Sequence, residues 1–244
     1  CLTLMALVTI GGLGFLVWEE LARVRKFKQF SVYTKLVLLM TAGILLVGTC
    51  MILMLEWNNP GTLGNMPFWQ KLMNAFFQTG TLRTAGFVTV DQMALKDATK
   101  VFSILIMFIG GSSGSTAGGL KTVTVLVLLL FVWAKARGKE RVHVFKRNIP
   151  TIKAIDAMTL TFITVLLSVF GGMLISAVAA TSFLDAWFEA VSAICTVGLS
   201  AVGTASLGIV AQSVIIAFMY FGRVGILTLS LGFLMGDKAK DRFQ

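Results

Sequence analysis

The sequence predicts an all-α integral membrane protein. Its repeating unit consists of a membrane span, a re-entrant pore loop and a second span, and these units surround a central pore, as in a channel. One span is broken by a Gly/Ser loop. Hydrophobic residues make up 57% of the 244 residues and charged residues only 13%, whereas a soluble domain carries about 25% charged residues. The apolar stretches are long and continuous, which favours helices over the alternating strands of a barrel. This composition excludes a soluble globular enzyme and a disordered chain.

Five apolar stretches are long enough to supply the ~20 helical residues that a bilayer core requires. They are residues 1–18, 36–55, 101–133, 157–180 and 209–235. Fifteen of the 21 Lys and Arg residues lie in segments 23–35, 135–153 and 238–242, each beside such a stretch. The positive-inside rule then predicts a multi-pass protein of the cell membrane with a cytoplasmic C-terminus. Because every basic segment flanks a span, we expect a lipid bilayer as its partner and no nucleic acid.

Two apolar segments, 68–82 and 184–194, are too short to cross, and both of their ends are predicted to lie outside. A segment that enters and leaves on one side is a re-entrant loop, which is tolerated where it lines protein or water. The two segments also repeat each other, since residues 76–87 read FFQTGTLRTAGF and residues 188–199 read FEAVSAICTVGL. The chain therefore contains two complete span–loop–span units after the final span of an earlier unit. Because it begins with Cys, we expect a further N-terminal part.

Each re-entrant segment ends in a Thr-x-Gly motif followed by an apolar residue. The first motif segment is Thr84, Ala85, Gly86 and Phe87, and the second is Thr196, Val197, Gly198 and Leu199. Glycine permits backbone that turns successive carbonyls toward one axis, and such carbonyls replace the hydration shell of a monovalent cation. We therefore predict a cation-binding selectivity filter at these eight residues. The simpler alternative is that the glycines only cap short interfacial helices.

A run of small residues interrupts the stretch 101–133, whose 33 residues would form a helix of about 50 Å, too long for a bilayer. The run consists of Gly110, Gly111, Ser112, Ser113, Gly114, Ser115, Thr116, Ala117, Gly118 and Gly119. Its amides must lie against protein or water. We predict a movable gating loop below the filter, with close helix packing through small residues as the alternative.

Two basic residues, Lys121 and Arg223, lie inside predicted spans, and Arg83 directly precedes the first Thr-x-Gly motif. Arg223 has an apolar stretch on both sides and is predicted to be the partner of the gating loop, since an intramembrane charge indicates function. The alternative is that it only ties two spans together. Lys121 follows the loop and could simply reach water, and Arg83 could simply cap the carbonyls of the preceding helix.

Enzymatic chemistry has little support in this sequence. Two short Ser motifs in the Gly/Ser run match hydrolase patterns, but the only histidine, His143, lies in a basic segment away from them. The three cysteines lie far apart, without metal-ligand spacing. We expect no enzyme, and no metal beyond a transported ion.

The segments RTAGF, CTVGLS, GGSSGSTAGGLKT and FGRVGILTLSLGF resemble the Trk/Ktr/HKT superfamily of potassium transporters, and most closely its bacterial KtrB membrane subunits. The resemblance covers essentially the whole chain and implies four span–loop–span repeats around one pore. Residues 1–30 would then be the final span of the second repeat, 31–150 the third repeat, and 151–244 the fourth repeat with a cytoplasmic tail. Two of the four filter strands would be absent from this sequence.

The resemblance also implies the ions and partners. Potassium would be the transported ion, sodium could act as an activator, and no cofactor would be tightly bound. The family implies a homodimer and a cytoplasmic KtrA-like nucleotide-binding regulatory ring. We therefore expect a pore-forming subunit for potassium uptake. The alternative is a secondary transporter with a midplane substrate site at the broken helix, but paired Thr-x-Gly segments favour the pore.

Overall fold

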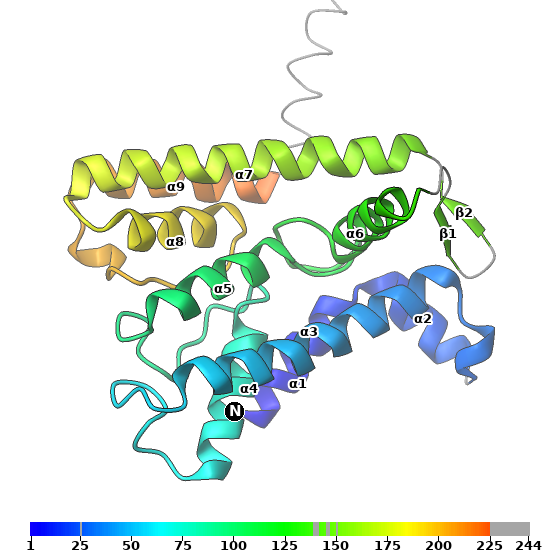
Figure 1. The fold of residues 1–244 in the computed structure, drawn as a ribbon, viewed down its shortest axis with the longest axis horizontal. Coiled ribbons are helices and arrows are strands. Elements are labelled where there is room, and N and C mark those ends of the chain that lie inside the picture. The colour runs from blue at the N-terminus through cyan, green and yellow to red at the C-terminus, as the bar shows by residue number, and fades with distance from the viewer. Residues whose placement is uncertain (25, 139–141, 145–146, 150, 225–244) are drawn as a thin grey trace, which may run out of the picture.

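The computed structural model describes residues 1–24, 26–138, 142–144, 147–149 and 151–224, and these are mainly helical (Figure 1). The α-helices are α1 (Leu2–Leu13), α2 (Phe15–Arg23), α3 (Val32–Glu56), α4 (Phe68–Thr81), α5 (Asp97–Phe108), α6 (Thr122–Ala136), α7 (Thr151–Ala179), α8 (Phe183–Ile194) and α9 (Ile209–Val224). Two 3-10 turns, η1 (Phe27–Gln29) and η2 (Thr204–Ser206), lie in connections.

A short hairpin departs from the predicted all-α fold. Strand β1 (Val142–Val144) pairs antiparallel with β2 (Arg147–Ile149) in the basic segment between α6 and α7. β-Branched valine and isoleucine favour extended backbone, a preference that the count of apolar spans does not reveal.

The described helices form two units of similar order. The first unit contains α3, the short α4, and α5 and α6 on either side of the Gly/Ser loop; the second contains α7, the short α8 and α9. Helix α3 and residues 154–179 of α7 are long and apolar enough to cross a membrane. The predicted span 209–235 is described only as far as Val224, and its remainder and the basic segment 238–242 lie outside the described residues.

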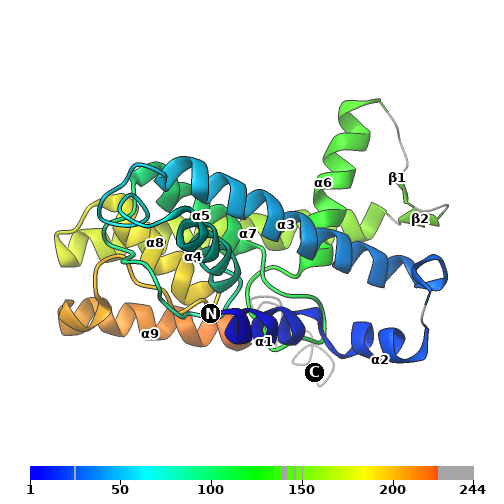
Figure 2. The same cartoon turned by 90° about the horizontal axis from the view of Figure 1, so that it is seen from below.

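The predicted span 1–18 is bent, because α1 and α2 meet at an angle of 95°. Gly14 lies between them with φ of 80°, a conformation that glycine adopts readily. A Cβ on Gly14 would lie 2.6 Å from Ser112 Oγ and 2.7 Å from the Ser113 carbonyl oxygen. The bend therefore brings the backbone against a loop about a hundred positions away in the sequence. Figure 2 shows α1 and α2 following one another along one side of the molecule.

Each short helix packs closely on the long first helix of its unit. A Cβ on Gly48 of α3 would lie 2.3 Å from Thr79 Cγ2 in α4, and a Cβ on Gly172 of α7 would lie 3.0 Å from Trp187 Cα in α8. Glycine at these points lets the helices approach, as is common between helices in membranes.

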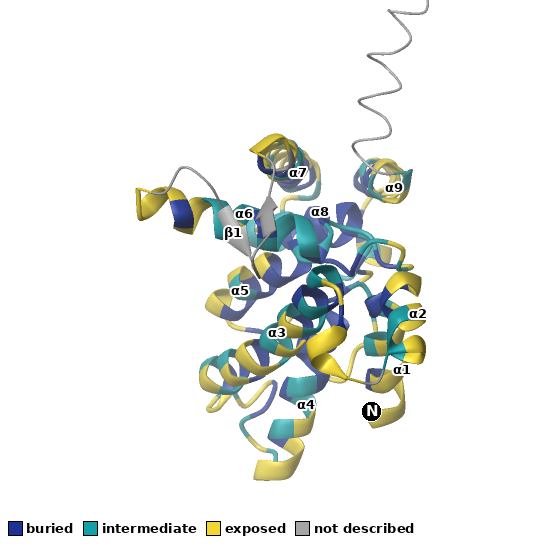
Figure 3. Ribbon diagram, turned by 90° about the vertical axis from the view of Figure 1, so that its right-hand side faces the viewer, coloured by how far each residue is buried: buried dark blue, intermediate teal, exposed yellow. Residues whose placement is uncertain are grey.

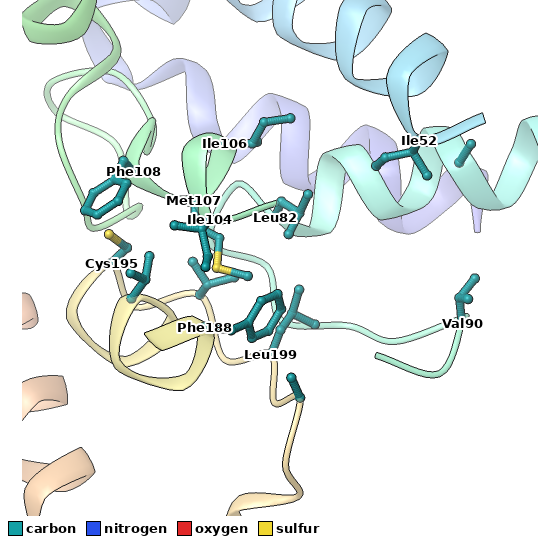
Figure 4. Packing of buried hydrophobic residues seen from close by; sticks show 14 of the residues in the cluster. Ile52, Leu82, Val90, Ile104, Ile106, Met107, Phe108, Phe188, Cys195 and Leu199 are labelled. Carbon is teal, nitrogen blue, oxygen red and sulfur yellow. The ribbon is translucent and has the colours of Figure 1, made fainter. Parts of the chain in front are cut away.

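The main core joins the two units. Figure 4 shows Leu82, Ile104, Met107, Phe188 and Leu199 gathered where α5, α8 and the segments after α4 and α8 meet. Figure 3 colours the exposed residues of the helices yellow. Many exposed residues are large and apolar, among them Leu46 of α3 and Phe162 of α7. Apolar exteriors around a packed centre suit helices surrounded by lipid.

Candidate functional site

The two predicted Thr-x-Gly segments have the same unusual backbone. The φ angles are 63° at Thr84 and 74° at Gly86, and 55° at Thr196 and 88° at Gly198. Among the described residues, the only other non-glycine residue with positive φ is Ala180. A β-branched residue with positive φ is a genuine outlier and costs about 1–3 kcal/mol. Such strain, repeated at equivalent positions, indicates that the surrounding structure imposes this geometry for a purpose.

The amides of these segments bond inward, whereas their carbonyls do not. The N–H groups of Ala85 and Gly86 donate to the Thr81 carbonyl at 3.1 and 3.4 Å, and the Val197 N–H donates to the Ser192 carbonyl at 2.8 Å. Within the described part of the chain, no group donates to the carbonyls of residues 84–86 or 196–198. Backbone carbonyls normally have partners, so these groups are available for a cation or for water.

The structure brings the two segments into direct contact at their glycines. A Cβ on Gly86 would lie only 2.6 Å from the Val197 carbonyl oxygen, and a Cβ on Gly198 would lie 3.6 Å from Gly86 Cα. The fourth positions differ, since Phe87 is half exposed whereas Leu199 is buried in the core. The Phe87 carbonyl also accepts a hydrogen bond from Thr81 Oγ1 at 2.7 Å. The shared geometry therefore extends over the first three residues of each segment.

Buried polar side chains support each segment, and sequence reasoning missed them. In the first unit, Gln78 of α4 and Gln92 exchange two amide hydrogen bonds of 2.6 and 3.0 Å. In the second, the carboxylate of Glu189 in α8 accepts from Ser200 Oγ at 2.9 Å, from the Ala201 N–H and from Thr204 Oγ1. Both helices thus hold the chain that follows the motif. The available signal was a polar residue in each short apolar helix, at positions one residue apart when the two segments are aligned.

The Gly/Ser loop folds back on itself between α5 and α6. The Gly110 N–H donates to the Leu120 carbonyl at 2.9 Å, and the Thr122 N–H donates to the Gly111 carbonyl at 3.0 Å. Lys121 Nζ donates to the Ala117 carbonyl at 2.7 Å, so this lysine closes the loop instead of merely reaching water. The loop is therefore an ordered, nearly closed turn with its ends held together.

The same loop contacts the end of α1. The Ser112 N–H donates to the Gly12 carbonyl at 3.0 Å, and the Phe15 N–H donates to the Gly114 carbonyl at 3.3 Å. Ser112 Oγ also donates to the carbonyl of Leu13. Backbone groups at the α1–α2 break and backbone groups of the Gly/Ser loop thus form hydrogen bonds with one another.

Three further elements touch the loop. Arg223 of α9 donates from Nη1 to the Thr116 carbonyl at 2.9 Å, and Tyr33 of α3 donates from Oη to the Ser113 carbonyl at 3.1 Å. A Cβ on Gly118 would lie 2.1 Å from Thr196 Oγ1. The loop consequently lies directly against the second Thr-x-Gly segment and is tied to the predicted Arg223.

A cavity of about 290 Å³ connects the first motif segment with the loop. Helix α1 lines it, together with Arg83, Thr84, Ala85 and Phe87 from one side and Thr116 and Ala117 of the loop. Within the ranges that the structure describes, no group of three His, Cys, Asp or Glu residues could hold a metal ion. The groups next to this cavity that lack a donor among the described residues are the backbone carbonyls of the motif, and such carbonyls suit a weakly held monovalent cation.

Known proteins resemble almost the whole chain. A family profile described as TrkH, cation transport protein, matches residues 2–241. The potassium/sodium uptake protein NtpJ of Enterococcus hirae is 38% identical over 94% of this chain and 52% of its own length. The Ktr system potassium uptake protein B of Bacillus subtilis is 36% identical over 99% of this chain and 54% of its own length.

A solved structure has the same fold. The crystal structure of the potassium transporter TrkH from Vibrio parahaemolyticus matches with a TM-score of 0.70 at 21% identity, over 93% of this chain and 50% of that one. The chain thus spans about half the length of the relatives that it matches.

Proposed function

The chain belongs to the TrkH family of cation transport proteins, and from this premise we propose that it forms half of a pore for potassium uptake. Thr84 to Phe87 and Thr196 to Leu199 are two strands of the selectivity filter. The single observation that carries the proposal is the meeting of two strained Thr-x-Gly segments whose carbonyls have no donor among the described residues. Carbonyls of this kind replace the hydration shell of a potassium ion without a fixed charge.

The loop Gly110–Gly119 is the gate of this pore. Its support is its position, since it contacts Thr196 and lines the cavity that also reaches Thr84. Arg223 holds the loop closed through the Thr116 carbonyl. A guanidinium keeps its charge at any accessible pH, so it also opposes the passage of a cation while the loop is in place.

The architecture and partners of the complete transporter are part of this proposal. Residues 1–30 end a second repeat, 31–150 form the third, and 151–244 form the fourth with a cytoplasmic tail. The protein is a homodimer in the cell membrane, regulated by a cytoplasmic KtrA-like nucleotide-binding ring. Potassium is its transported ion and sodium its activator. The outward apolar faces and the likeness to a Ktr system protein support these statements.

Potassium uptake by the full-length protein tests the filter. Cells that lack their own potassium uptake should grow at low potassium concentration when they express the full-length protein. The variant Gly198→Ser should weaken the preference of this protein for potassium over sodium. Gly198 has a φ of 88°, which a residue with a Cβ rarely adopts, so serine at this position should shift the backbone and its carbonyls. Gly208, whose Cβ would meet nothing within 4 Å, provides the control Gly208→Ser. Unchanged potassium affinity and selectivity in Gly198→Ser would contradict the filter.

Shortening the loop tests the gate separately. Removal of Ser113 to Ser115 should raise potassium flux and loosen its dependence on the cytoplasmic partner, because a plug of small residues is then lost. If the shortened protein folds and conducts no better than the parent, the loop is a packing element and not a gate.

A further inference from the structure

Among the described residues, Arg83 is a buried cation whose guanidinium has no hydrogen-bond partner. It lies between α4 and Thr84, and only 7% of it is exposed. Its Nε and Nη2 are buried, and no described residue accepts a hydrogen bond from the guanidinium. Lys71 of α4, a second buried cation, donates instead to the Trp57 carbonyl at 2.9 Å and lies over the Trp57 ring. Three buried hydroxyls among the described residues also lack a partner, those of Thr41, Ser103 and Thr181, but Arg83 carries a charge, and a buried charge without a partner requires an explanation.

Capping of α4 does not explain why a positive charge is buried at Arg83. The side chain reaches none of the last carbonyls of α4; only its backbone N–H does, by donating to the Gly80 carbonyl at 3.1 Å. The second unit supplies a comparison, because the residue before Thr196 is Cys195, which is uncharged and buried. Helix α8 therefore ends before the same motif without a charge. The positive charge is a property of one unit and not a requirement of the helix end.

The position of Arg83 points to the ion path. It lines the cavity of about 290 Å³ that Thr84, Ala85 and the loop residues Thr116 and Ala117 also line. It also lines a second void of about 10 Å³ beside Gly111. A guanidinium cannot lose its proton there, so any cation between the filter and the loop meets a fixed positive charge.

We propose that Arg83 limits the cation occupancy of the cavity between the first filter strand and the gating loop, and so weakens binding of potassium from the cytoplasmic side. This inference rests on the proposed function. Gly11 and Gly12, near the C-terminal end of α1, line the same cavity, and the partial negative charge of a helix C-terminus offsets part of the repulsion. A cation can thus still bind in the cavity, but it is held less tightly than it would be without Arg83. Weaker binding lets the cation leave the cavity and so prevents it from blocking the pore.

Potassium currents through the full-length protein in planar bilayers test this proposal. The measured quantity is the cytoplasmic potassium concentration that gives half-maximal current. Arg83→Gln should lower it about tenfold, an order-of-magnitude expectation for the loss of one unit charge beside the cavity. Arg83→Lys, which keeps the charge, should stay within about twofold of the parent. Lys71→Gln is the matched control, since it removes a buried charge from α4, the helix that precedes Arg83, away from the cavity, and it should change nothing.

A second variant keeps the test decisive if Arg83→Gln fails to fold. Leu7 lines the same cavity and is 60% exposed, so Leu7→Glu can add a carboxylate while Arg83 stays in place, with Leu7→Gln as its neutral control. Leu7→Glu alone should lower the half-maximal concentration. Equal effects of Arg83→Gln and Arg83→Lys, or of Leu7→Glu and Leu7→Gln, would overturn the role of charge, as would no effect at all. Absence of potassium current in the parent protein would instead contradict the proposed function itself.

Discussion

The two units share the backbone of their Thr-x-Gly segments but differ in nearly everything around it. Both have a threonine and a glycine with positive φ. The first segment is held by the Gln78–Gln92 amide pair and is preceded by the buried Arg83, whereas the second is held by the Glu189 carboxylate and is preceded by Cys195. The helix after the first segment is broken by the Gly/Ser loop, whereas α9 is continuous as far as Val224.

This difference separates what the geometry requires from what each unit adds. The strained motif, a short helix before it and a polar support after it occur in both units, so they are the features that accompany this carbonyl geometry. The loop and the Arg83 charge occur in one unit only. In the proposed function, ion coordination is shared by both units, whereas the loop and the Arg83 charge belong to the first unit and Arg223, which contacts the loop, belongs to the second.

The largest expected effect comes from adding a methyl group to each glycine in turn. Gly86→Ala brings a Cβ to 2.6 Å from the Val197 carbonyl oxygen, while Gly198→Ala meets only Gly86 Cα at 3.6 Å. Both variants also carry left-handed strain of about 1–2 kcal/mol. The ratio of potassium to sodium permeability should fall roughly tenfold or more in Gly86→Ala and only a few-fold in Gly198→Ala. Equal losses would mean that the close contact between the strands does not set selectivity.

Arg223 tests whether the broken helix and α9 act together. Arg223→Ala removes the hydrogen bond to the Thr116 carbonyl and the positive charge, so potassium flux per folded molecule should rise several-fold. Arg223→Lys should retain part of the barrier but lose the fork-like pairing. Flux is normalised to folded protein measured by size-exclusion chromatography. A loss of stability without a gain in normalised flux would show that Arg223 only ties the two helices together.

The two supports should differ in cost because one is a carboxylate. In the parent protein, Ser200 and Ala201 donate to the Glu189 carboxylate. In Glu189→Gln, an amide N–H would face these donors and leave buried donors unpaired, so the free energy of unfolding should fall by about 1–3 kcal/mol. In Gln78→Leu, Gln92 keeps its bond to the Val90 carbonyl, so a loss of about 1 kcal/mol is expected. Thermal unfolding of the full-length protein in detergent measures both. A greater loss in Gln78→Leu would reverse the assignment of the stronger support.

The smallest effect is expected at the ion pair that joins the units. Lys100 Nζ lies 2.6 Å from Asp185 Oδ1, and the two side chains are 7% and 24% exposed. Asp185→Asn removes the charge but keeps an acceptor, so the loss of stability should be about 1 kcal/mol. The double variant with Lys100→Met should be less destabilising than the sum of the single variants, as measured by a thermal double-mutant cycle. Strict additivity would show that the pair does not connect the units energetically.

The sequence alone predicted the local elements well. The short apolar stretches 68–82 and 184–194 became α4 and α8 within one residue at either end, and the run of glycines interrupted the long stretch 101–133. Hydrophobic length and glycine content determine these features locally, so they can be deduced without tertiary information. The motif glycines permit the positive φ that both of them adopt, although the residue type alone does not require it.

Tertiary contacts could not be deduced in this way. The bend at Gly14 packs against the loop around Ser112, and no residue near Gly14 in the sequence indicates this contact. Glu189 was visible only as one acidic residue in an apolar helix, and its donors became known once the chain after the motif folded back. Arg83 shows the same limit, because its lack of a partner emerges only when every neighbouring carbonyl has been placed.

The most direct measurement is the location of a heavy monovalent cation in the full-length protein. Thallium substitutes for potassium and gives an anomalous signal in diffraction from crystals. The account predicts a peak between the two motif segments, within coordination distance of the carbonyls of Thr84 to Gly86 and Thr196 to Gly198. A peak confined to the Gly/Ser loop, with none between the segments, would contradict the filter and favour a secondary transporter with its site at the broken helix.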